Sequence, residues 1–462
     1  MNLEIIILAA GKGKRMHSSL PKVLHKVADK PMLQHVIDTA CLLSPKAIHI
    51  VVGHQSDRVL EMINTLPLAQ RELIHIAIQK EQLGTGHAVA CAMPNVDKDS
   101  CVLVLYGDTP LTPASLLSKF YASLSDHDLL IMSAYTDNPF GYGRIIRGDD
   151  NKLVKITEEK DANNQEKQIK EVNTGIILAK SSTLDAYLPR IKNSNTQGEY
   201  YLTDLPELLI NEHQKVGVMI APDFEMLLGV NSKTQLSVVE RLYQRRKAQE
   251  LLESGVTLAD PERFDLRGQL ECGQDVFIDI NCIFSGTVKL GNNVIIGPGC
   301  LLKDCEIGDN SVISAYTVIE ESLVKKANTL GPFARLRPGN ILEDNVHVGN
   351  FVECKKAHLG QDTKAGHLSY LGDAEIGKNV NIGAGTITCN YDGANKFKTT
   401  IGDDVFIGSD TQLVAPVTVK NGVTVGAGTT VTKRISSNEG ALIITRAEAT
   451  VIDNYPRPHK QH

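Results

Sequence analysis

The chain has 462 residues, of which 42% are hydrophobic and 22% charged, with a formal net charge of −6. A chain of this length can bury two or three separate cores. Its charge is not that of a general polyanion-binding protein, so we expect no nucleic-acid partner, and any phosphate must be bound by a local arrangement of Lys, Arg and backbone N–H groups.

The cysteines and the N-terminus bear on the cellular location. Nine cysteines are scattered without any C-x-x-C pair, which disfavours a disulfide framework or a structural zinc site and favours a reducing compartment. The first apolar run covers only Ile5 to Ala10 before glycines and charges begin, which is too short for a signal peptide or a membrane span. We therefore expect a cytoplasmic protein without a membrane partner.

Up to about residue 228, short apolar runs alternate with amphipathic stretches. This alternation predicts a Rossmann-like α/β domain, with a mainly parallel sheet between two layers of helices. The predicted strands are Glu4–Leu8, Ile48–Val52, Cys101–Leu105, Asp128–Met132 and Gly175–Leu178, and predicted helices include Pro31–Leu43 and Pro113–Leu124.

The first predicted strand runs into the segment LAAGKGKRM, residues 8–16, with Pro21-Lys22 close behind. Glycines at the carboxyl end of a first strand let the backbone approach a phosphate or a base. A dinucleotide fingerprint is excluded because Met16 stands where its third glycine is required, and a P-loop is excluded because no G-K-[ST] follows. Arg15 and Lys22 supply two cations for a triphosphate.

Two further segments of this half suit a ligand. Residues 79–86, QKEQLGTG, form a polar, glycine-bearing loop suited to packing against the edge of a base. Tyr106-Gly107-Asp108 follows the strand VLVL, which places Asp108 at a strand's carboxyl end, where open α/β sheets bind ligands. Asp108 is equally suited to a turn that caps the next helix, since Thr109-Pro110 follows it.

Residues 232–255 are predicted to form a charged, largely exposed helix that connects two domains. Ser232 and Gln235 have the spacing of a capping box, apolar residues recur at helical spacing, and Gly255 suits the C-terminal end.

Beyond about residue 256, every sixth residue is aliphatic in two long runs. A six-residue period fits a solenoid in which three hexads make one triangular coil, with the aliphatic side chain inside and a glycine permitting the corner. The runs are Val312, Val318, Val324, Leu330, Leu336, Leu342, Val348, and then Ile401, Ile407, Leu413, Val419, Val425, Val431. The period slips between Gly383 and Ile401, where the segment ITCNYDGANKFKTT must loop out, and long loops on rigid solenoids tend to carry function.

Ionisable groups interrupt the aliphatic rhythm around His367, between Gly366 and Leu368. A lone histidine is more often structural than catalytic. Here Arg337 and Lys355 precede it at near-multiples of a coil, which predicts that the three stack along one edge as a phosphate-and-base constellation.

Together these motifs resemble a known family. The pattern L-x-x-G-x-G-x-R-M-x-x-x-x-P-K, then Q-x-x-x-x-G-T, then Y-G-D resembles the sugar-1-phosphate nucleotidyltransferases. With the hexads and their loop, the chain from Ile6 to about Arg446 resembles the bacterial bifunctional N-acetylglucosamine-1-phosphate uridyltransferase/glucosamine-1-phosphate acetyltransferase family. The resemblance implies a uridyltransferase domain over residues 1–231, a linker helix over 232–255, and a left-handed parallel β-helix acetyltransferase domain over 256–462. It also implies a homotrimer whose acetyl sites form between neighbouring chains, and a product used in peptidoglycan, cell-wall and lipopolysaccharide synthesis.

The resemblance also implies roles for single residues. For the uridine nucleotide and its sugar they are Leu8, Ala9, Ala10, Gly11, Arg15, Lys22, Gln79, Gly84, Thr85, Tyr106, Gly107, Gly143, Glu158 and Asn173, with Asp108 and Asn231 holding Mg²⁺. For glucosamine-1-phosphate they are Arg337, Lys355, Tyr370, Asn381, Asn390 and Tyr391, with His367 as general base; for acetyl-CoA they are Ala384, Ser409, Ala427 and Arg446. Lys14 departs from the family, whose members usually have Ser or Thr there, and we expect little effect.

The sequence leaves alternatives open. Asn381 and Ser409 equally fit ordinary polar positions of a coil. The runner-up function is a nucleotidyltransferase whose β-helix serves only assembly or regulation. A non-enzymatic scaffold leaves Arg15, Lys22 and Asp108 without a purpose.

Overall fold

A computed structural model describes residues 2–53, 55–446 and 448–456. The chain divides into two compact units, Met1–Tyr243 and Gln244–His462, and we describe each by itself. Within the described residues, no helix has the length and apolar composition that crossing a membrane requires.

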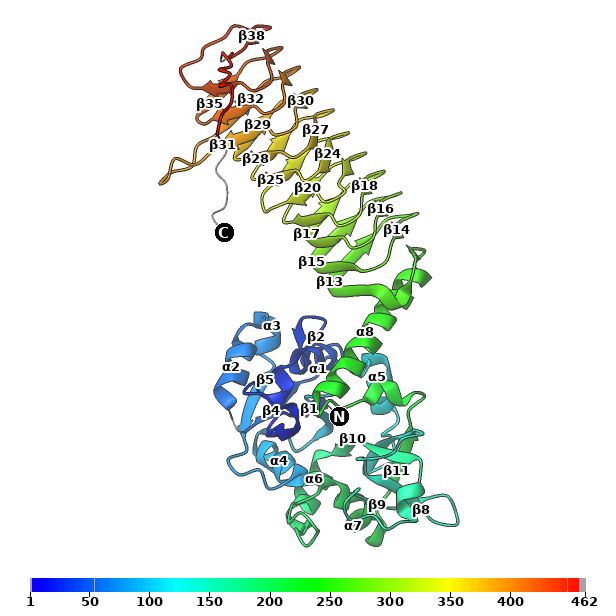
Figure 1. Ribbon diagram of the computed structural model, residues 1–462. Helices are drawn as coiled ribbons and strands as arrows, with labels where there is room; N and C mark the ends of the chain where they lie inside the picture. Colours follow the sequence, from blue (N-terminus) through cyan, green and yellow to red (C-terminus); the bar gives the residue numbers. More distant parts are fainter. Residues whose placement is uncertain (1, 54, 447, 457–462) are drawn as a thin grey trace. The chain divides into compact units, whose positions relative to one another are not determined.

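The first unit is built on a sheet with the strand order β11-β7-β10-β6-β1-β4-β5, to which β8 and β9 add a hairpin (Figure 1). Its strands are β1 (Asn2–Leu8), β4 (Ala47–Val52), β5 (Ile74–Ile78), β6 (Ser100–Tyr106), β7 (Leu129–Tyr135), β8 (Arg144–Arg147), β9 (Leu153–Thr157), β10 (Glu171–Lys180) and β11 (Val216–Ile220), beside a small ribbon of β2 (Lys26–Val27) and β3 (Lys30–Pro31). All five predicted strands are present. β10 runs antiparallel to β6 and β7, whereas β1, β4, β5 and β6 are parallel.

Both faces of this sheet are buried, which explains the continuous apolar runs. In β1, Ile5 and Ile7 pack into one hydrophobic cluster and Ile6 into another, as the two-residue period of a strand requires. Helices α1 (Met32–Cys41), α2 (Ser56–Asn64) and α5 (Ala114–Ala122) supply the first cluster. Helices α4 (Thr85–Ala92), α6 (Ser181–Tyr187) and α7 (Leu205–Asn211) supply the second, and α3 (Leu68–Arg71) is a single turn.

Helix α8 (Lys233–Glu253) confirms the predicted helix but is less exposed than expected, because each half of the helix packs into a different hydrophobic core. Val239 and Leu242 pack in a cluster of the first unit. Ala248 and Leu251 pack in the core of the second unit. The boundary between the compact units therefore falls inside this helix.

This packing predicts how the first unit tolerates truncation. A fragment of residues 1–243 should unfold in one cooperative transition, whereas a fragment ending at Asn231 should melt roughly 10–20 °C lower, because it loses the buried Val239 and Leu242 side chains. Thermal denaturation followed by circular dichroism measures the difference. Equal melting temperatures would show that the N-terminal half of α8 contributes nothing to this core.

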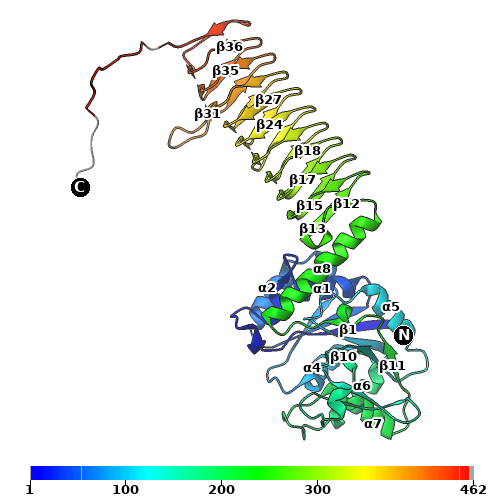
Figure 2. The ribbon, with the colours of Figure 1, turned by 45° about the vertical axis from the view of Figure 1, so that its right-hand side comes forward.

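The second unit is a parallel β-solenoid whose coils stack one on the next (Figures 1 and 2). The first face contains β12 (Thr257–Leu258), β14 (Phe277–Ile278), β16 (Ile295–Ile296), β18 (Val312–Ile313), β21 (Thr329–Leu330), β24 (His347–Asn350), β27 (Lys364–His367), β30 (Asn381–Ile382), β33 (Phe406–Ile407), β36 (Thr424–Val425) and β38 (Leu442–Ile443). The second contains β19 (Val318–Glu320), β22 (Arg335–Leu336), β25 (Glu353–Lys355), β28 (Tyr370–Gly372), β31 (Ile387–Cys389), β34 (Gln412–Val414) and β37 (Thr430–Thr432). The third contains β20 (Leu323–Val324), β23 (Ile341–Leu342), β26 (His358–Leu359), β29 (Ala374–Ile376), β32 (Thr399–Ile401) and β35 (Val417–Val419). The longer β13 (Phe264–Cys272), β15 (Cys282–Leu290) and β17 (Leu301–Ile307) form the first coils, and β17 pairs with strands of both the second and third faces.

The aliphatic repeat fills the solenoid interior as predicted, with one correction. Val312 and Val318 are half-buried, and the neighbouring Ile313 and Ile319 point inside instead. The interior series therefore shortens from six residues to five between Ile319 and Val324, and is fully buried from there through Val348. The sequence pattern missed this because both positions of each pair are aliphatic.

Glycines after the aliphatic residues have a different role from the predicted one. A Cβ on Gly383 would lie 2.5 Å from the backbone nitrogen of Ser409, and a Cβ on Gly408 would lie 2.5 Å from that of Ala427. These glycines allow neighbouring coils to approach closely. The left-handed torsions of the corners belong to other residues, such as Asn345 with φ 59°.

Candidate active sites

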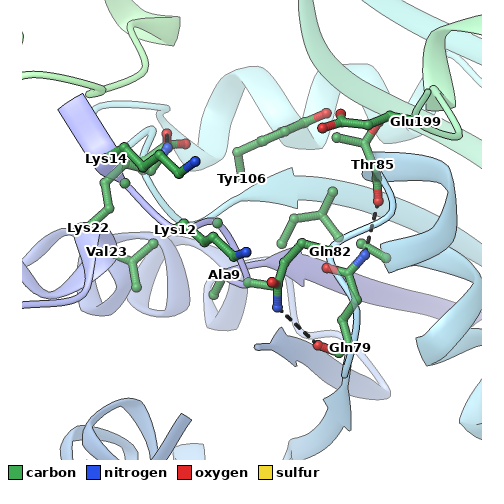
Figure 3. Close-up of a pocket in the computed structure, with 17 residues that line it drawn as sticks. Ala9, Lys12, Lys14, Lys22, Val23, Gln79, Gln82, Thr85, Tyr106 and Glu199 are labelled. Atoms are coloured by element: carbon green, nitrogen blue, oxygen red, sulfur yellow. Dashed lines mark hydrogen bonds and ion pairs between the residues drawn. The ribbon is translucent and has the colours of Figure 1, made fainter. Parts of the chain in front are cut away.

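A cavity of about 470 Å³ opens at the carboxyl ends of β1 and β6 (Figure 3). This is the edge at which parallel strands of an open α/β sheet present a ligand site. It brings together the predicted Leu8, Ala9, Ala10, Gly11, Lys22, Gln79, Gly84, Thr85, Tyr106 and Asp108, and adds Lys12, Gly13, Lys14, Val23, Gln82, Ala88 and Glu199. Lys12 and Gln82 lie inside motifs that the sequence had singled out, whereas Glu199 comes from a distant segment without a local signal.

One cationic side chain and two side-chain oxygen groups meet at the rim of this cavity. The Lys22 ammonium donates to the carboxylate of Asp108 and, at 3.1 Å, to the amide oxygen of Asn231. Asp108 is buried and follows β6, so its carboxylate is held at a fixed place. Asn231 precedes α8, and its backbone N–H donates to Gln235 Oε1 at 2.7 Å.

Asp108 and Asn231 fit the predicted Mg²⁺ by their chemistry. Both are hard oxygen donors, and both reach the same positive charge in this structure. Mg²⁺ in phosphate-transferring sites takes one or two protein oxygens and completes its shell with phosphate and water. The cap of α8 explains how two ligands far apart in sequence converge: Ser232 Oγ accepts from Gln235 N at 3.2 Å while Gln235 holds Asn231.

The cations around the cavity differ in part from the predicted pair. Lys22 lines it, but Arg15 is exposed and is not among the lining residues. Lys12 and Lys14 line it instead. Lys14 is the position where the chain departs from the family that it resembles, so the departure adds a positive charge to the cavity wall.

The loop after β5 forms the opposite wall (Figure 3). The Gln79 side-chain nitrogen donates to the Gly84 carbonyl at 3.1 Å and lies 3.0 Å from His87 Nδ1. Thr85 Oγ1 accepts from the backbone N–H of Leu202 at 3.0 Å. Gln79 and Thr85 therefore belong to a hydrogen-bonded frame and not to a free loop.

The residues predicted for the sugar lie together, but none of Gly143, Glu158 and Asn173 lines the large cavity. A Cβ on Gly143 would lie 3.6 Å from both Asn173 Cβ and Glu158 Cδ. The Asn173 backbone N–H donates to the Gly143 carbonyl at 2.8 Å. Glu158 accepts from Thr203 Oγ1 at 2.8 Å, and burial raises the pKa of its carboxyl group. Asn173 lines a small cavity together with Tyr106, which also lines the large one.

Gly107 is placed differently from its predicted neighbours. A Cβ there would lie 3.2 Å from Leu33 and Val23, so the residue faces the core, and its N–H donates to the Leu8 carbonyl at 3.0 Å. Gly107 therefore shapes the junction of β1 and β6 rather than lining the cavity.

In the solenoid, Arg337 and Lys355 stack as predicted, but His367 does not join them. Arg335 pairs with Glu353 and Lys355 with Gly372, whereas His367 pairs with Asn350. His367 thus ends a strand of the first face, whereas Lys355 ends a strand of the second face and Arg337 directly follows one. The predicted single stack of three is wrong, because His367 follows Lys355 by about two-thirds of a coil and therefore reaches a different corner.

The Arg337 and Lys355 corner carries a concentration of positive charge. Lys396, from the looped-out segment, and Arg337 lower the pKa of Lys355, while Asp373 opposes them. We call Arg337, Lys355 and Lys396 the cationic corner. Lys396 has no motif of its own in the sequence, although it lies in the looped-out segment between Gly383 and Ile401.

Three of the remaining predicted sugar-phosphate residues lie near this corner. Asn390 donates to Asp373 at 2.5 Å, and the exposed Tyr391 donates to the Gly393 carbonyl at 2.5 Å. A Cβ on Gly372 would lie 2.4 Å from the Tyr370 hydroxyl, so that hydroxyl reaches toward the end of β28. Asn381 is apart from them, exposed at the start of β30 on the first face.

His367 forms a column with the residues predicted for acetyl-CoA. Its Nδ1 lies 2.7 Å from Asn350 Oδ1, and its side chain is exposed. Continuing the strand register along the first face places Ala384, Ser409 and Ala427 next to it in successive coils. Arg446 closes the column by donating to the Ala427 carbonyl at 3.2 Å.

Models of known protein families match several parts of the chain. Residues 266–360 match the model of the GMPPB C-terminal domain, and residues 398–433 match six repeats of the bacterial transferase hexapeptide. Among solved structures, a UDP-glucose pyrophosphorylase complexed with UDP-glucose is 16% identical, with 53% of this chain and 100% of that chain covered and a TM-score of 0.45. HddC from Yersinia pseudotuberculosis, complexed with GMP-PN, is 18% identical over the same shares, with a TM-score of 0.40.

The family of the first part follows from one further match. The model of the MobA-like NTP transferase domain matches residues 5–257, which is more than half of the chain. It spans the sheet, the large cavity and the whole of α8. The chain therefore belongs to the MobA-like NTP transferase domain family and is a nucleotidyltransferase that also carries hexapeptide repeats.

Proposed function

We propose that the protein makes UDP-N-acetylglucosamine in two steps. The solenoid transfers the acetyl group of acetyl-CoA to the amine of glucosamine-1-phosphate. The first unit then transfers a uridylyl group from UTP to N-acetylglucosamine-1-phosphate and releases pyrophosphate. The observation that carries the proposal is the convergence of Lys22, Asp108 and Asn231 at the rim of the large cavity.

In the uridylyl step the sugar phosphate attacks the α-phosphorus of UTP, so the chain must position two anions and offset their charge. Lys12, Lys14 and Lys22 supply positive charge around the triphosphate. Asp108 and Asn231 would hold Mg²⁺, which when bound withdraws charge from the phosphate oxygens. Glu158 and Asn173 would orient the sugar on the side that Tyr106 shares with the nucleotide.

In the acetyl step the substrate's own amine is the nucleophile, so the chain needs a proton acceptor and an anchor for the phosphate. His367 supplies the acceptor, and the cationic corner suits the phosphate. The column of Ala384, Ser409 and Ala427 leads away from His367 as a track for acetyl-CoA. Because His367 and Lys355 end strands of different faces, a neighbouring chain is expected to help enclose each site.

The alternative is a nucleotidyltransferase with a β-helix that serves only assembly. The cationic corner favours the two-step proposal. Lys396 and Arg337 lower the pKa of Lys355 although Asp373 opposes them and Glu353 pairs with Arg337 at 3.0 Å, so a bound anion would relieve the remaining repulsion.

One assay tests both steps. Purified protein is given glucosamine-1-phosphate, acetyl-CoA, UTP and Mg²⁺, with each omitted in turn. The nucleotide sugar should appear only in the complete mixture, and N-acetylglucosamine-1-phosphate should replace the first two components. The fragment of residues 1–243 should perform the uridylyl step alone. Failure with glucosamine-1-phosphate but success with the acetylated sugar would favour the single-function alternative.

We also expect the full chain to be a trimer in solution, with acetylation dependent on assembly. Sedimentation equilibrium measures the mass, and acetylation is assayed in the same samples. A stable monomer that retains full acetyltransferase activity would contradict the shared site.

A further inference from the structure

We infer that His87 is a specificity-determining residue: it holds the Gln79 carboxamide so that the cavity accepts a base with an imide N–H, as in uracil or thymine, and rejects cytosine. The inference deepens the proposed uridylyl transfer and rests on it for the identity of UTP. His87 lies on α4, one helical turn before Cys91, and is not among the residues that line the cavity.

The orientation of the Gln79 amide follows from its partners. Its nitrogen lies 3.1 Å from the Gly84 carbonyl oxygen and 3.0 Å from His87 Nδ1. A backbone carbonyl can only accept, so the group that faces it must be the NH₂ and not the oxygen. The second N–H then points at His87 Nδ1, which must accept it.

The same contact fixes the tautomer of the histidine. With Nδ1 accepting, the ring proton sits on Nε2, which lies 3.8 Å from Cys91 Sγ. The series of hydrogen bonds from Gly84 through Gln79 to His87 therefore has one consistent assignment of donors and acceptors. Rotation of the amide by half a turn would place its oxygen against the Gly84 carbonyl, lose that bond and require His87 to change its tautomer.

The Gly84 carbonyl, the first acceptor in this series of hydrogen bonds, is held in place by the backbone around it. Gly84 has φ +115°, and a Cβ there would lie 2.6 Å from the Tyr200 carbonyl oxygen. Tyr200 N–H donates to the Leu83 carbonyl at 2.8 Å, and Gly86 N–H donates to the Tyr200 carbonyl at 2.8 Å. The loop thus cannot shift to suit a flipped amide.

This orientation of the amide decides which group the side-chain oxygen of Gln79, Oε1, can accept from a ligand. Gln79 is only 3% exposed, and within the described part of the chain no hydrogen-bond donor is recorded for its Oε1. Figure 3 shows this oxygen on the cavity side of the amide. An acceptor in the cavity wall pairs with the N3–H of uracil, whereas N3 of cytosine carries a lone pair and would leave two acceptors facing each other. A site built this way rejects the wrong partner strongly.

The test compares His87→Leu, which removes the acceptor, with His87→Asn, whose side-chain oxygen reaches about the place of Nδ1. Cys91→Ala, one turn further along the same helix, is the matched control. Titration calorimetry of each full-length protein with UTP and with CTP, both with Mg²⁺, gives the ratio of their dissociation constants. Uridylyl transfer to N-acetylglucosamine-1-phosphate is assayed separately.

We expect the wild type to bind UTP on the order of 10²-fold more tightly than CTP. His87→Leu should lower this ratio about tenfold or more, and His87→Asn and Cys91→Ala should keep it within about threefold. A purely structural histidine would weaken UTP and CTP binding together and leave the ratio unchanged, which overturns the inference. A wild type without a preference for UTP overturns it as well. A ratio that responds as expected in a protein that forms no nucleotide sugar supports the inference and refutes the proposed function.

Discussion

Replacing His367 by alanine should lower acetylation of glucosamine-1-phosphate by roughly 10²–10⁴-fold, the usual contribution of a general base. Uridylyl transfer should be unchanged, because the first unit has its own core and its own cavity. Acetyl transfer measured by thiol release, with uridylyl transfer in the same preparation as the internal control, checks the result.

The local geometry says which atom of His367 acts. Nδ1 lies 2.7 Å from Asn350 Oδ1, so a proton on Nδ1 is donated to that oxygen and the lone pair on Nε2 is left for the substrate amine. Asn350→Ala should therefore reduce acetylation less than His367→Ala, by about tenfold, because the tautomer is then no longer fixed.

The outcome that would contradict this role is specific. Folded, assembled His367→Ala protein with near-normal acetylation would remove His367 from the chemistry. Loss of assembly together with activity would instead indicate a structural histidine, although its exposed side chain makes that outcome the less expected one.

Replacing Asp108 by alanine should lower uridylyl transfer on the order of 10³-fold, while acetylation survives. The change removes one of the two oxygen donors proposed for Mg²⁺, and charge stabilisation by a metal contributes several kcal/mol to phosphoryl chemistry. Initial rates measured over a Mg²⁺ titration separate a loss of metal binding from a loss of the transfer step.

Asp97→Ala is the matched control, because it also removes a Lys–Asp ion pair of the first unit. Asp97 pairs with Lys46 at 2.5 Å and precedes β6, whereas Asp108 follows that strand. We expect Asp97→Ala to keep uridylyl transfer within about twofold. If Asp108→Ala lowered both activities and the melting temperature together, Asp108 would have the role of a structural turn, which the sequence also allowed.

The sequence predicted elements whose signal lies in neighbouring residues. The strand Glu4–Leu8 was visible because both faces of β1 are buried, and the helix over 232–255 because its cap and its spacing are local. Strand β10 shows the limit: its apolar run was found, but its antiparallel direction depends on pairing with β6 and β7. The apolar composition of a strand indicates that it is buried, but not whether it runs parallel or antiparallel to its neighbours.

For the candidate sites, the sequence by itself determined the loop after β1, the Tyr106–Asp108 turn and the presence of a solenoid, because each is a short motif or a period. Only the tertiary structure decided which distant residues meet. Asn231 reaches Lys22 because the start of α8 is packed there, and His367 joins Ala384 and Ser409 rather than Lys355 because strand register sets the corner of each residue. A coil of 17 residues is not an exact multiple of six. His367 follows Lys355 by only about two-thirds of such a coil, so the two side chains reach different corners, and the paired strands fix which corner each one takes.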